Sequence, residues 1–252
     1  MDLKLAGLKA LVTGAGTGIG RGIALTLAGE GVRLGIAGRK VDALEALRGE
    51  LLDAGCEQVE TLPGDLSVPE GVAAVADRAL AAFGTIDVLV NNAGGSRPLT
   101  PADGESTWQE SFDLNFSAAR RLSERLMPGM IAKGFGRIVN LTGATVYWNV
   151  NAATPAKAAL QSWAKGLAAE VAPKGITVNC IAPGRINSHQ ILTRLHPTEA
   201  SRQQFIAANI PIGYFGEPED VANVVAFLAS PRNGYLTGIT IPVDGGLFRL
   251  SF

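Results

Sequence analysis

The chain has 252 residues, of which 47% are apolar and 18% are charged, and its formal net charge is −1. This composition excludes a disordered chain, and the length allows one α/β domain with a substantial core. Basic and acidic residues are mixed, and no basic stripe, membrane-spanning apolar run or signal peptide is evident, so we expect a cytoplasmic protein with no nucleic-acid or membrane partner.

Short apolar runs of strand length alternate with stretches of helical periodicity along most of the chain. The expected strands are residues 8–12, 32–37, 58–62, 86–90, 137–141, 176–181 and 239–243. One expected helix directly follows the first strand. The others cover residues 41–54, 70–83, 156–171 and 218–228, and a long helical region runs through 127 to 133. Unbroken apolar strands that alternate with helices indicate a parallel sheet covered on both faces. The sequence therefore predicts a single α/β domain over residues 1–252, a doubly wound parallel sheet of Rossmann type.

The first expected strand ends in a glycine-rich turn that leads into a helix. Its glycines at 14, 16, 18 and 20 form a variant of the dinucleotide fingerprint. A strand that turns tightly into a helix directs unpaired N–H groups and a positive dipole end at one point, which suits a phosphate. The candidate phosphate-binding residues are Gly14, Thr17, Gly18, Ile19 and Gly20. A glycine-rich turn without a ligand is the alternative.

Residues 185–217 interrupt the strand–helix rhythm. They follow a strand whose carboxyl end should border a ligand crevice, and long segments at that place are often lids. We therefore expect a substrate lid, with an irregular surface insertion as an equal alternative. Two cysteines and two histidines in the whole chain predict no metal site.

Several motifs in order, each at the end of an expected strand, give the chain a recognisable pattern. They are Thr13-Gly14-x-x-x-Gly18-Ile19-Gly20, Asp65 in Gly-Asp-Leu-Ser, Asn91-Asn92-Ala93-Gly94, Asn115, Lys157, Pro183-Gly184 and Val243-Asp244-Gly245-Gly246. With these motifs the chain resembles the classical short-chain dehydrogenase/reductase family, and the β-ketoacyl-carrier-protein reductases in particular. The resemblance runs nearly from end to end.

The resemblance implies a bound dinucleotide cofactor. The glycine turn would hold the pyrophosphate, and the other cofactor-binding residues would be Asp65, Leu66, Asn92, Ala93, Gly94, Lys157, Pro183, Gly184 and Ile186. Asp65 would accept a hydrogen bond from the adenine amino group; a turn or a helix cap is its alternative role. Ile186 is also a candidate wall residue of an apolar pocket, together with Trp148 and Phe215.

The end of the second expected strand indicates which cofactor is bound. An acidic residue there would hydrogen-bond the ribose hydroxyls of NAD. Here Arg39 and Lys40 follow the strand, and no acidic residue precedes Asp42. An arginine fork can bind a 2′-phosphate with two hydrogen bonds, and a lysine adds a point charge. The sequence therefore favours NADP(H) over NAD(H), with a solvated helix start as the alternative.

The catalytic residues depart from the family pattern. The family supplies a proton from a tyrosine four residues before the lysine, and a serine after the fifth strand holds the substrate oxygen. Here Ala153 stands four residues before Lys157, and Gly143 takes the serine position. Thr142 and Thr145 are the candidate replacements for the serine hydroxyl. Lys157 suits cofactor binding as well as catalysis. Asn115 would shape the fourth helix and hold a water beside the lysine, or would be an interior polar group bonded to backbone.

Tyr147, ten residues before Lys157, is the candidate proton donor, and a packed aromatic lid residue is its alternative. Tyr214 is a weaker second candidate.

Two functions remain open. The first is an NADP(H)-dependent reductase of a ketone or an activated C=C bond, with an atypical active site. The second is a catalytically silent nucleotide-binding subunit of a mixed oligomer. For either, we expect a small-molecule ligand and a homotetramer or dimer, or a hetero-oligomer with an active relative.

Overall fold

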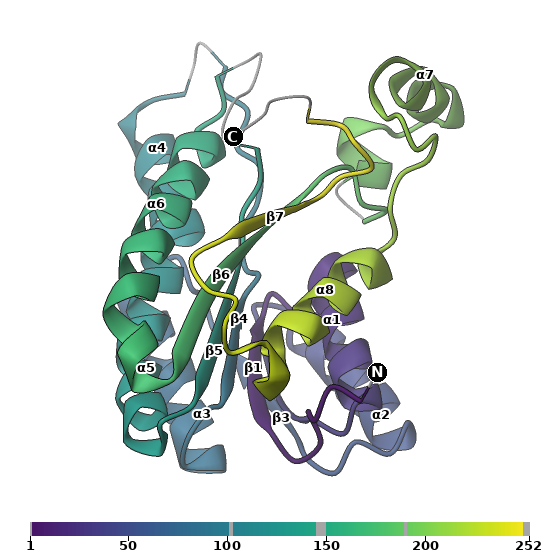
Figure 1. The fold of residues 1–252 in the computed structure, drawn as a ribbon. Coiled ribbons are helices and arrows are strands. Elements are labelled where there is room, and N and C mark those ends of the chain that lie inside the picture. Colours follow the sequence, from purple (N-terminus) through teal and green to yellow (C-terminus); the bar gives the residue numbers. More distant parts are fainter. Residues whose placement is uncertain (1, 101–102, 145–149, 189–190, 249–252) are drawn as a thin grey trace.

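The computed structural model describes residues 2–100, 103–144, 150–188 and 191–248. Its centre is one seven-stranded sheet in which all neighbouring strands run parallel, in the order β3-β2-β1-β4-β5-β6-β7 (Figure 1). The strands are β1 (Lys9–Thr13), β2 (Arg33–Gly38), β3 (Val59–Pro63), β4 (Val88–Asn91), β5 (Gly136–Leu141), β6 (Ile176–Pro183) and β7 (Thr240–Val243). The expected doubly wound parallel sheet is confirmed.

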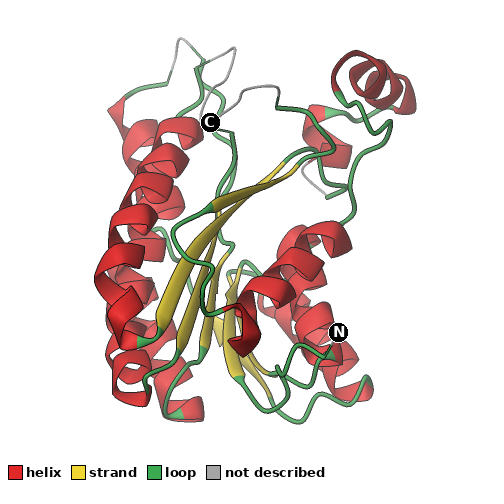
Figure 2. Cartoon of the chain, in the orientation of Figure 1, coloured by secondary structure: helices red, strands yellow, loops and turns green. Residues whose placement is uncertain are grey.

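Helices cover both faces of the sheet (Figure 2). One layer consists of α1 (Gly18–Gly29), α2 (Val41–Asp53) and α8 (Pro218–Ala229). The other consists of α3 (Pro69–Phe83), α4 (Glu105–Phe112), α5 (Ala118–Lys133) and α6 (Ala153–Val171). A π-helical turn, Asp113–Ser117, joins α4 to α5. α7 (Glu199–Asn209) lies apart from both layers, beyond the carboxyl ends of the strands.

The strand sequences are continuously apolar because each strand supplies two cores. In β1, Ala10 and Val12 belong to the cluster beneath α1, α2 and α8, while Leu11 between them belongs to the cluster beneath α3, α5 and α6. Successive side chains point to opposite faces of a strand. Both faces of β1 are therefore removed from water, as in other parallel sheets covered by helices.

The chain order places a crevice at the carboxyl ends of β1 and β4. After β3 the chain crosses the sheet and continues at β4, on the other side of β1. The helices that follow β1 and β4 then lie on opposite faces, which leaves an opening between them at the strand ends. The glycine turn follows β1 and the Asn-Asn-Ala-Gly motif follows β4, so the topology brings these two motifs to one edge.

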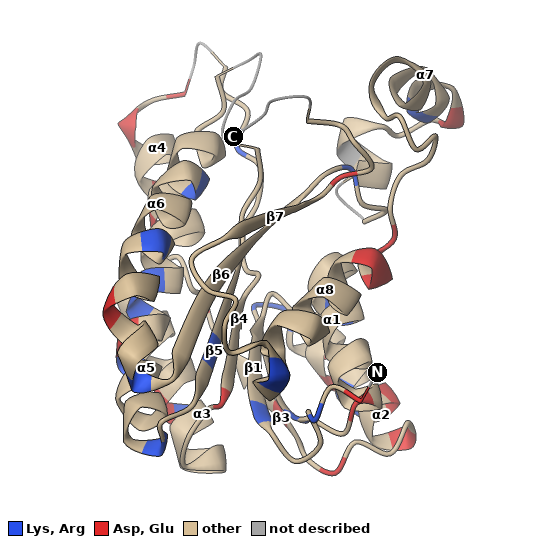
Figure 3. Cartoon of the chain, viewed as in Figure 1, with Lys and Arg blue, Asp and Glu red and all other residues tan. Residues whose placement is uncertain are grey.

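The described surface is mixed in charge, and both cysteine thiols are buried. Among the described residues, no helix is long and apolar enough to cross a membrane, and no three His, Cys, Asp or Glu side chains are grouped as metal ligands. Basic and acidic side chains are interspersed in the view of Figure 3. Cys56 and Cys180 are both buried, and burial raises the pKa of each thiol, that of Cys180 to about 12.

The strands and helices lie within three residues of the expected bounds, except in two places. The region before residue 133 contains the π-helical turn Asp113–Ser117, and the segment 185–217 contains a second π-helix, Ile191–Leu195, and α7. A π turn differs from an α turn by one residue, so the periodicity of a short segment does not distinguish them.

Candidate active site

The glycine turn between β1 and α1 brings backbone close to backbone. Gly14 and Gly18 have φ of +64° and +54°, which side-chain-bearing residues rarely adopt. A Cβ on Gly20 would lie 2.2 Å from the Gly14 carbonyl oxygen, so Gly20 has no room for a side chain. The Thr17 side chain does not cap α1, which leaves the first N–H groups of this 12-residue helix open toward the crevice. This cradle fits a phosphate group.

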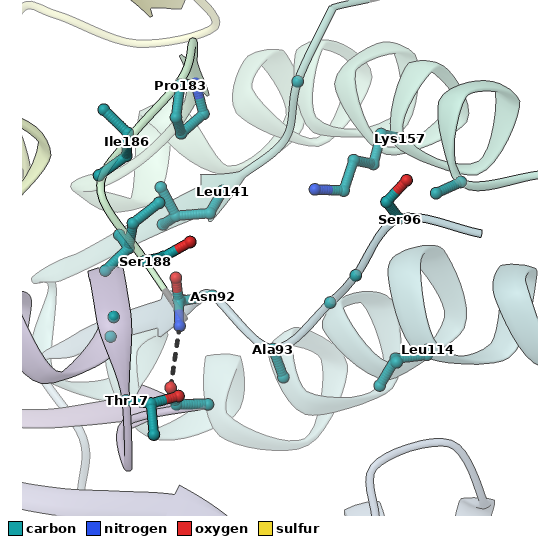
Figure 4. Close-up of a pocket in the computed structure, with 18 of the residues that line it drawn as sticks. Thr17, Asn92, Ala93, Ser96, Leu114, Leu141, Lys157, Pro183, Ile186 and Ser188 are labelled. Atoms are coloured by element: carbon teal, nitrogen blue, oxygen red, sulfur yellow. Dashed lines mark hydrogen bonds between the residues drawn. The ribbon is translucent and has the colours of Figure 1, made fainter. Parts of the chain in front are cut away.

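Asn92 and Ala93 hold the glycine turn in place. The Asn92 Nδ2 donates to the carbonyl oxygens of Thr13 at 2.9 Å and Gly14 at 3.2 Å. The backbone N–H groups of Asn92 and Ala93 both donate to the Thr13 Oγ1, each at 2.9 Å. Figure 4 shows the Asn92 amide beside the turn. Asn92 thus stabilises the glycine turn and also lines the cavity beside it.

The far rim of the crevice carries two cations and one carboxylate. Arg39 and Lys40 are exposed, and neither forms an ion pair with any described residue. Asp65 Oδ1 accepts hydrogen bonds from the N–H of Ser67 at 2.9 Å and its hydroxyl at 2.7 Å. These hydrogen bonds, aided by the charge of Arg39, lower the pKa of Asp65. Asp65 therefore shapes its turn and also lines the crevice, so both roles considered for it are compatible.

These parts belong to one cavity of about 960 Å³. The candidate residues that line it are Gly14, Thr17, Gly18, Ile19, Gly20, Arg39, Lys40, Asp65, Leu66, Asn92, Ala93, Gly94, Thr142, Lys157, Pro183, Gly184 and Ile186. Tyr147 lies outside the described residues, as do Thr145 and Trp148. Asn115 lies behind the wall, and its role is described below. The cavity continues from the glycine cradle to Lys157.

Lys157 enters the cavity from α6 (Figure 4). Its Nζ donates to the Thr142 carbonyl oxygen at 3.0 Å. Burial disfavours the ammonium form and lowers the pKa of Lys157 to about 8. Ala153, one helical turn earlier, is buried and lines the same cavity with a methyl group.

Thr142 has already used its hydroxyl hydrogen. Its Oγ1 donates to the Ile181 carbonyl oxygen at 2.9 Å and accepts from the Gln161 Nε2, also at 2.9 Å. A hydroxyl has one hydrogen, so Thr142 in this arrangement has none to give to a ligand. The expected role of Thr142 as a donor to substrate therefore requires that its bond to Ile181 be broken.

Asn115 supports the loop after β4 from the π-helical turn. Its Nδ2 donates to the Ser111 carbonyl oxygen at 3.0 Å, and its Oδ1 accepts from the Gly95 N–H at 3.0 Å. A Cβ on Gly94 would lie 2.8 Å from that Oδ1. These bonds are those of the alternative role, an interior polar group bonded to backbone, and the role of Asn115 in holding a water beside Lys157 stays a prediction.

The segment 185–217 has a small core of its own. Ile191, Ile210 and Phe215 are buried together, with Phe205 packed against them. Ile186 lines the cavity, but Phe215 belongs to this core and not to the cavity wall, because the chain folds back on itself here. Tyr214 is exposed and does not line the cavity. Tyr214 is therefore not placed to give a proton there.

Three polar residues of this site were not predicted from the sequence. Ser96 and Asn151 line the same cavity as Lys157, and Gln161 donates both to Thr142 Oγ1 and to the Gly143 carbonyl oxygen, at 2.9 Å each. Ser96 directly follows the Asn-Asn-Ala-Gly-Gly run after β4, and a hydroxyl at the end of a central strand was the signal available.

Comparison with known proteins identifies the family. The family described as enoyl-(acyl carrier protein) reductase matches residues 14–248. The chain belongs to the short-chain dehydrogenase/reductase family. A 3-oxoacyl-(acyl-carrier-protein) reductase FabG of Escherichia coli strain K12 is 36% identical over 253 residues, which cover 98% of this chain and 100% of the relative. A nodulation protein G of Rhizobium sp. strain N33 is 38% identical, with 97% and 98% covered.

Solved structures of the family share the whole fold. L-sorbose reductase from Gluconobacter frateurii, in complex with NADPH and L-sorbose, superposes with a TM-score of 0.95 at 34% identity and 100% coverage of both chains. A putative NAD(P)-dependent gluconate 5-dehydrogenase from Beutenbergia cavernae, with bound NADP, has a TM-score of 0.90 at 35% identity, with 98% of this chain and 99% of that chain covered. Members of the family with different named substrates therefore share this architecture.

Proposed function

We propose that the protein is an NADP(H)-dependent oxidoreductase of the ketoreductase type, which transfers hydride to a ketone or an activated C=C bond. The observation that carries this proposal is the single cavity that joins the glycine cradle, the cationic rim and Lys157. Both the family match and the NADPH- and NADP-bound structural relatives support it.

The residues present fit NADP(H). The cradle of Gly14, Gly18 and Gly20 would receive a pyrophosphate, because the first N–H groups of α1 have no side-chain cap and remain open toward the cavity. Arg39 and Lys40 would bind the 2′-phosphate, since both line the cavity and neither forms an ion pair with a described residue. Asp65 and Leu66 would hold the adenine, and Lys157 and residues 183–186 the nicotinamide end. When bound, the nicotinamide supplies the hydride.

The proton must come from a group other than a tyrosine at the family position, which is Ala153 here. We propose Tyr147 as that donor, because it precedes Lys157 by ten residues in the sequence and carries the phenol that the family position lacks. The Lys157 ammonium would stabilise the negative charge that develops on the substrate oxygen. Asn115 would support this centre through the loop after β4.

The outer part of the cavity favours a substrate with an apolar body. Its lining includes Pro98, Val150, Leu195, Leu247 and Phe248. Apolar walls with a few placed polar groups are typical of sites for such ligands. Residues 185–217, with the small core around Phe215, would act as the lid over this part.

The assembly and location complete the proposal. The helical surface of α4, α5 and α6 would support a homotetramer or dimer, in the cytoplasm. A catalytically silent nucleotide-binding subunit of a mixed oligomer is the second candidate, and the observation that favours it is the Ala153 methyl in place of a phenol.

The decisive experiment is NADPH oxidation by the purified protein with β-ketoacyl thioesters, enoyl thioesters and small ketones, with Tyr147→Phe measured beside it. Turnover that Tyr147→Phe abolishes without a change in NADPH affinity identifies Tyr147 as the donor. A positioned acid contributes about 10²–10⁴-fold in rate. Turnover that ignores the substitution assigns the proton to another group or to water. Tight NADPH binding with no turnover on any substrate supports the silent subunit.

A further inference from the structure

Two hydroxyl groups, those of Thr142 and Ser96, belong to residues that line the same cavity as Lys157, and they differ in where their hydrogens point. Thr142 Oγ1 donates its hydrogen to the Ile181 carbonyl oxygen at 2.9 Å and accepts from Gln161. Its hydrogen is therefore committed to the backbone of β6. The second hydroxyl, Ser96, belongs to the loop after β4 and lines the same cavity.

The Ser96 Oγ accepts a hydrogen bond from the Asn151 Nδ2 at 2.7 Å. An amide nitrogen only donates, so the Ser96 hydrogen must point in another direction. In the chain segments that the structure describes, no acceptor receives that hydrogen. Ser96 thus keeps a hydrogen available at the cavity, whereas Thr142 does not.

The orientation of the Asn151 amide is fixed by two other hydrogen bonds. Its Oδ1 accepts from the N–H of Arg97 at 3.1 Å and from the N–H of Ala153 at 2.9 Å. Two backbone donors identify that atom as the oxygen, which leaves the NH₂ group facing Ser96. In addition, the Ala152 N–H donates to the Arg97 carbonyl oxygen at 3.0 Å, so the loop and the start of α6 are tied together.

This pair stands where the family phenol is absent. Ser96, Asn151, Ala153 and Lys157 all line the one cavity, and Figure 4 shows Ser96 close to Lys157 in that view. Ala153 contributes only a methyl group to this cavity, whereas Ser96 contributes a hydroxyl group. The Lys157 Nζ donates one of its hydrogens to Thr142 O and has two others.

We propose that Ser96 donates a hydrogen bond to the carbonyl oxygen of the substrate, and that Asn151 positions Ser96 by donating to it. The proposal rests on the proposed function and specifies its substrate as a carbonyl compound, a ketone or a conjugated thioester. Hydride adds to the carbonyl carbon of a ketone or to the β-carbon of a conjugated thioester, and in both cases negative charge gathers on the carbonyl oxygen. A donor held in place beforehand stabilises that charge. Ser96 would then be a catalytic residue and Asn151 a positioning residue.

Ser96→Ala removes the donor and Ser96→Thr keeps it. We expect Ser96→Ala to lower kcat with acetoacetyl-CoA or cyclohexanone about 100-fold, as loss of one such donor does elsewhere, with little change in NADPH affinity. Ser96→Thr should keep kcat within about fivefold. Ser162→Ala, on the exposed side of α6, is the matched control and should leave kcat unchanged. A kcat for Ser96→Ala within about threefold of the unaltered protein overturns the proposal.

Asn151→Asp tests the direction of the hydrogen bond while keeping the side-chain shape. One carboxylate oxygen would still accept from Arg97 and Ala153, but the other would accept the Ser96 hydrogen and withdraw it from the substrate. We expect a fall in kcat similar to that of Ser96→Ala, and no further fall when both changes are combined. A further fall in the combined variant overturns the positioning role of Asn151.

Ligand binding separates this proposal from the proposed function. If the protein binds NADPH but turns over no substrate, calorimetric titration of the NADPH complex with cyclohexanone and acetoacetyl-CoA still decides. An approximately tenfold weaker affinity in Ser96→Ala supports the hydrogen bond even without turnover. Equal affinities overturn it, and no binding of either carbonyl compound to the unaltered protein overturns both.

Discussion

Replacing Arg39 by alanine should weaken NADPH binding much more than NADH binding. Arg39 lies on the rim of the cavity and forms no ion pair with a described residue, so its guanidinium group is available to the 2′-phosphate. A hydrogen bond to a charged group contributes about 1.5–3 kcal/mol. Arg39 is exposed, which places the effect near the lower end because water and salt screen it. We expect NADPH to bind about 10- to 30-fold more weakly.

The measurement is a fluorescence titration of the protein with NADPH and, separately, NADH, at low and high salt. The loss for NADPH should shrink at high salt, and NADH affinity should change by less than about threefold. Arg48→Ala removes the same charge from the exposed face of α2, outside the cavity, and serves as the control. An equal loss for both nucleotides would refute the assignment of Arg39 to the 2′-phosphate.

Three further predictions concern stability and the cradle. Burial lowers the pKa of Lys157 from 10.5 to about 8, so between these pH values the unfolded chain holds a proton that the folded chain has lost, and the free energy of unfolding rises with pH. Lys157→Met removes the buried charge and should therefore stabilise the protein by about 2 kcal/mol at pH 7 in thermal unfolding. This gain should be lost near pH 10.5. Gly20→Ala should abolish measurable NADPH binding and lower stability by about 2 kcal/mol or more, because its Cβ would meet backbone, whereas Gly29→Ala in the same helix has open space and should be neutral or stabilising. Asn115→Ala leaves the Gly95 N–H without its acceptor and should lower the free energy of unfolding by about 1–3 kcal/mol in urea titration, and an unchanged midpoint would contradict this role.

The fold was predictable because the apolar pattern of each strand reflects which of its two faces are buried. Leu11 and Val12 pack into different cores, so the run that contains them has no polar position, and only a strand covered on both faces tolerates that pattern. α7 was not predicted, because its face toward the small core of residues 185–217 is short and none of its residues is buried. Periodicity is weak where burial is weak.

The cofactor half of the site was predictable for a related reason. Glycines such as Gly20 are required by backbone contacts within a few residues of themselves, and those requirements are visible in the motif. The catalytic half depends on pairings between distant residues. Thr142 loses its hydrogen to Ile181, 39 residues away, and Ser96 is oriented by Asn151, 55 residues away. No local pattern indicates which of two hydroxyls is free. The assignment of Tyr147 stays a prediction.

The burial of both native thiols makes the protein directly suitable for site-specific labelling. With a pKa of about 12, the Cys180 thiol is in its reactive anionic form in only about one molecule in ten thousand at pH 8. Cys56 is likewise enclosed, beneath α2. A single cysteine introduced at the exposed Ala200 of α7 would react with a maleimide dye far faster than either. Such a label would report in real time whether α7 moves when a nucleotide or a carbonyl compound enters, with both native cysteines left in place.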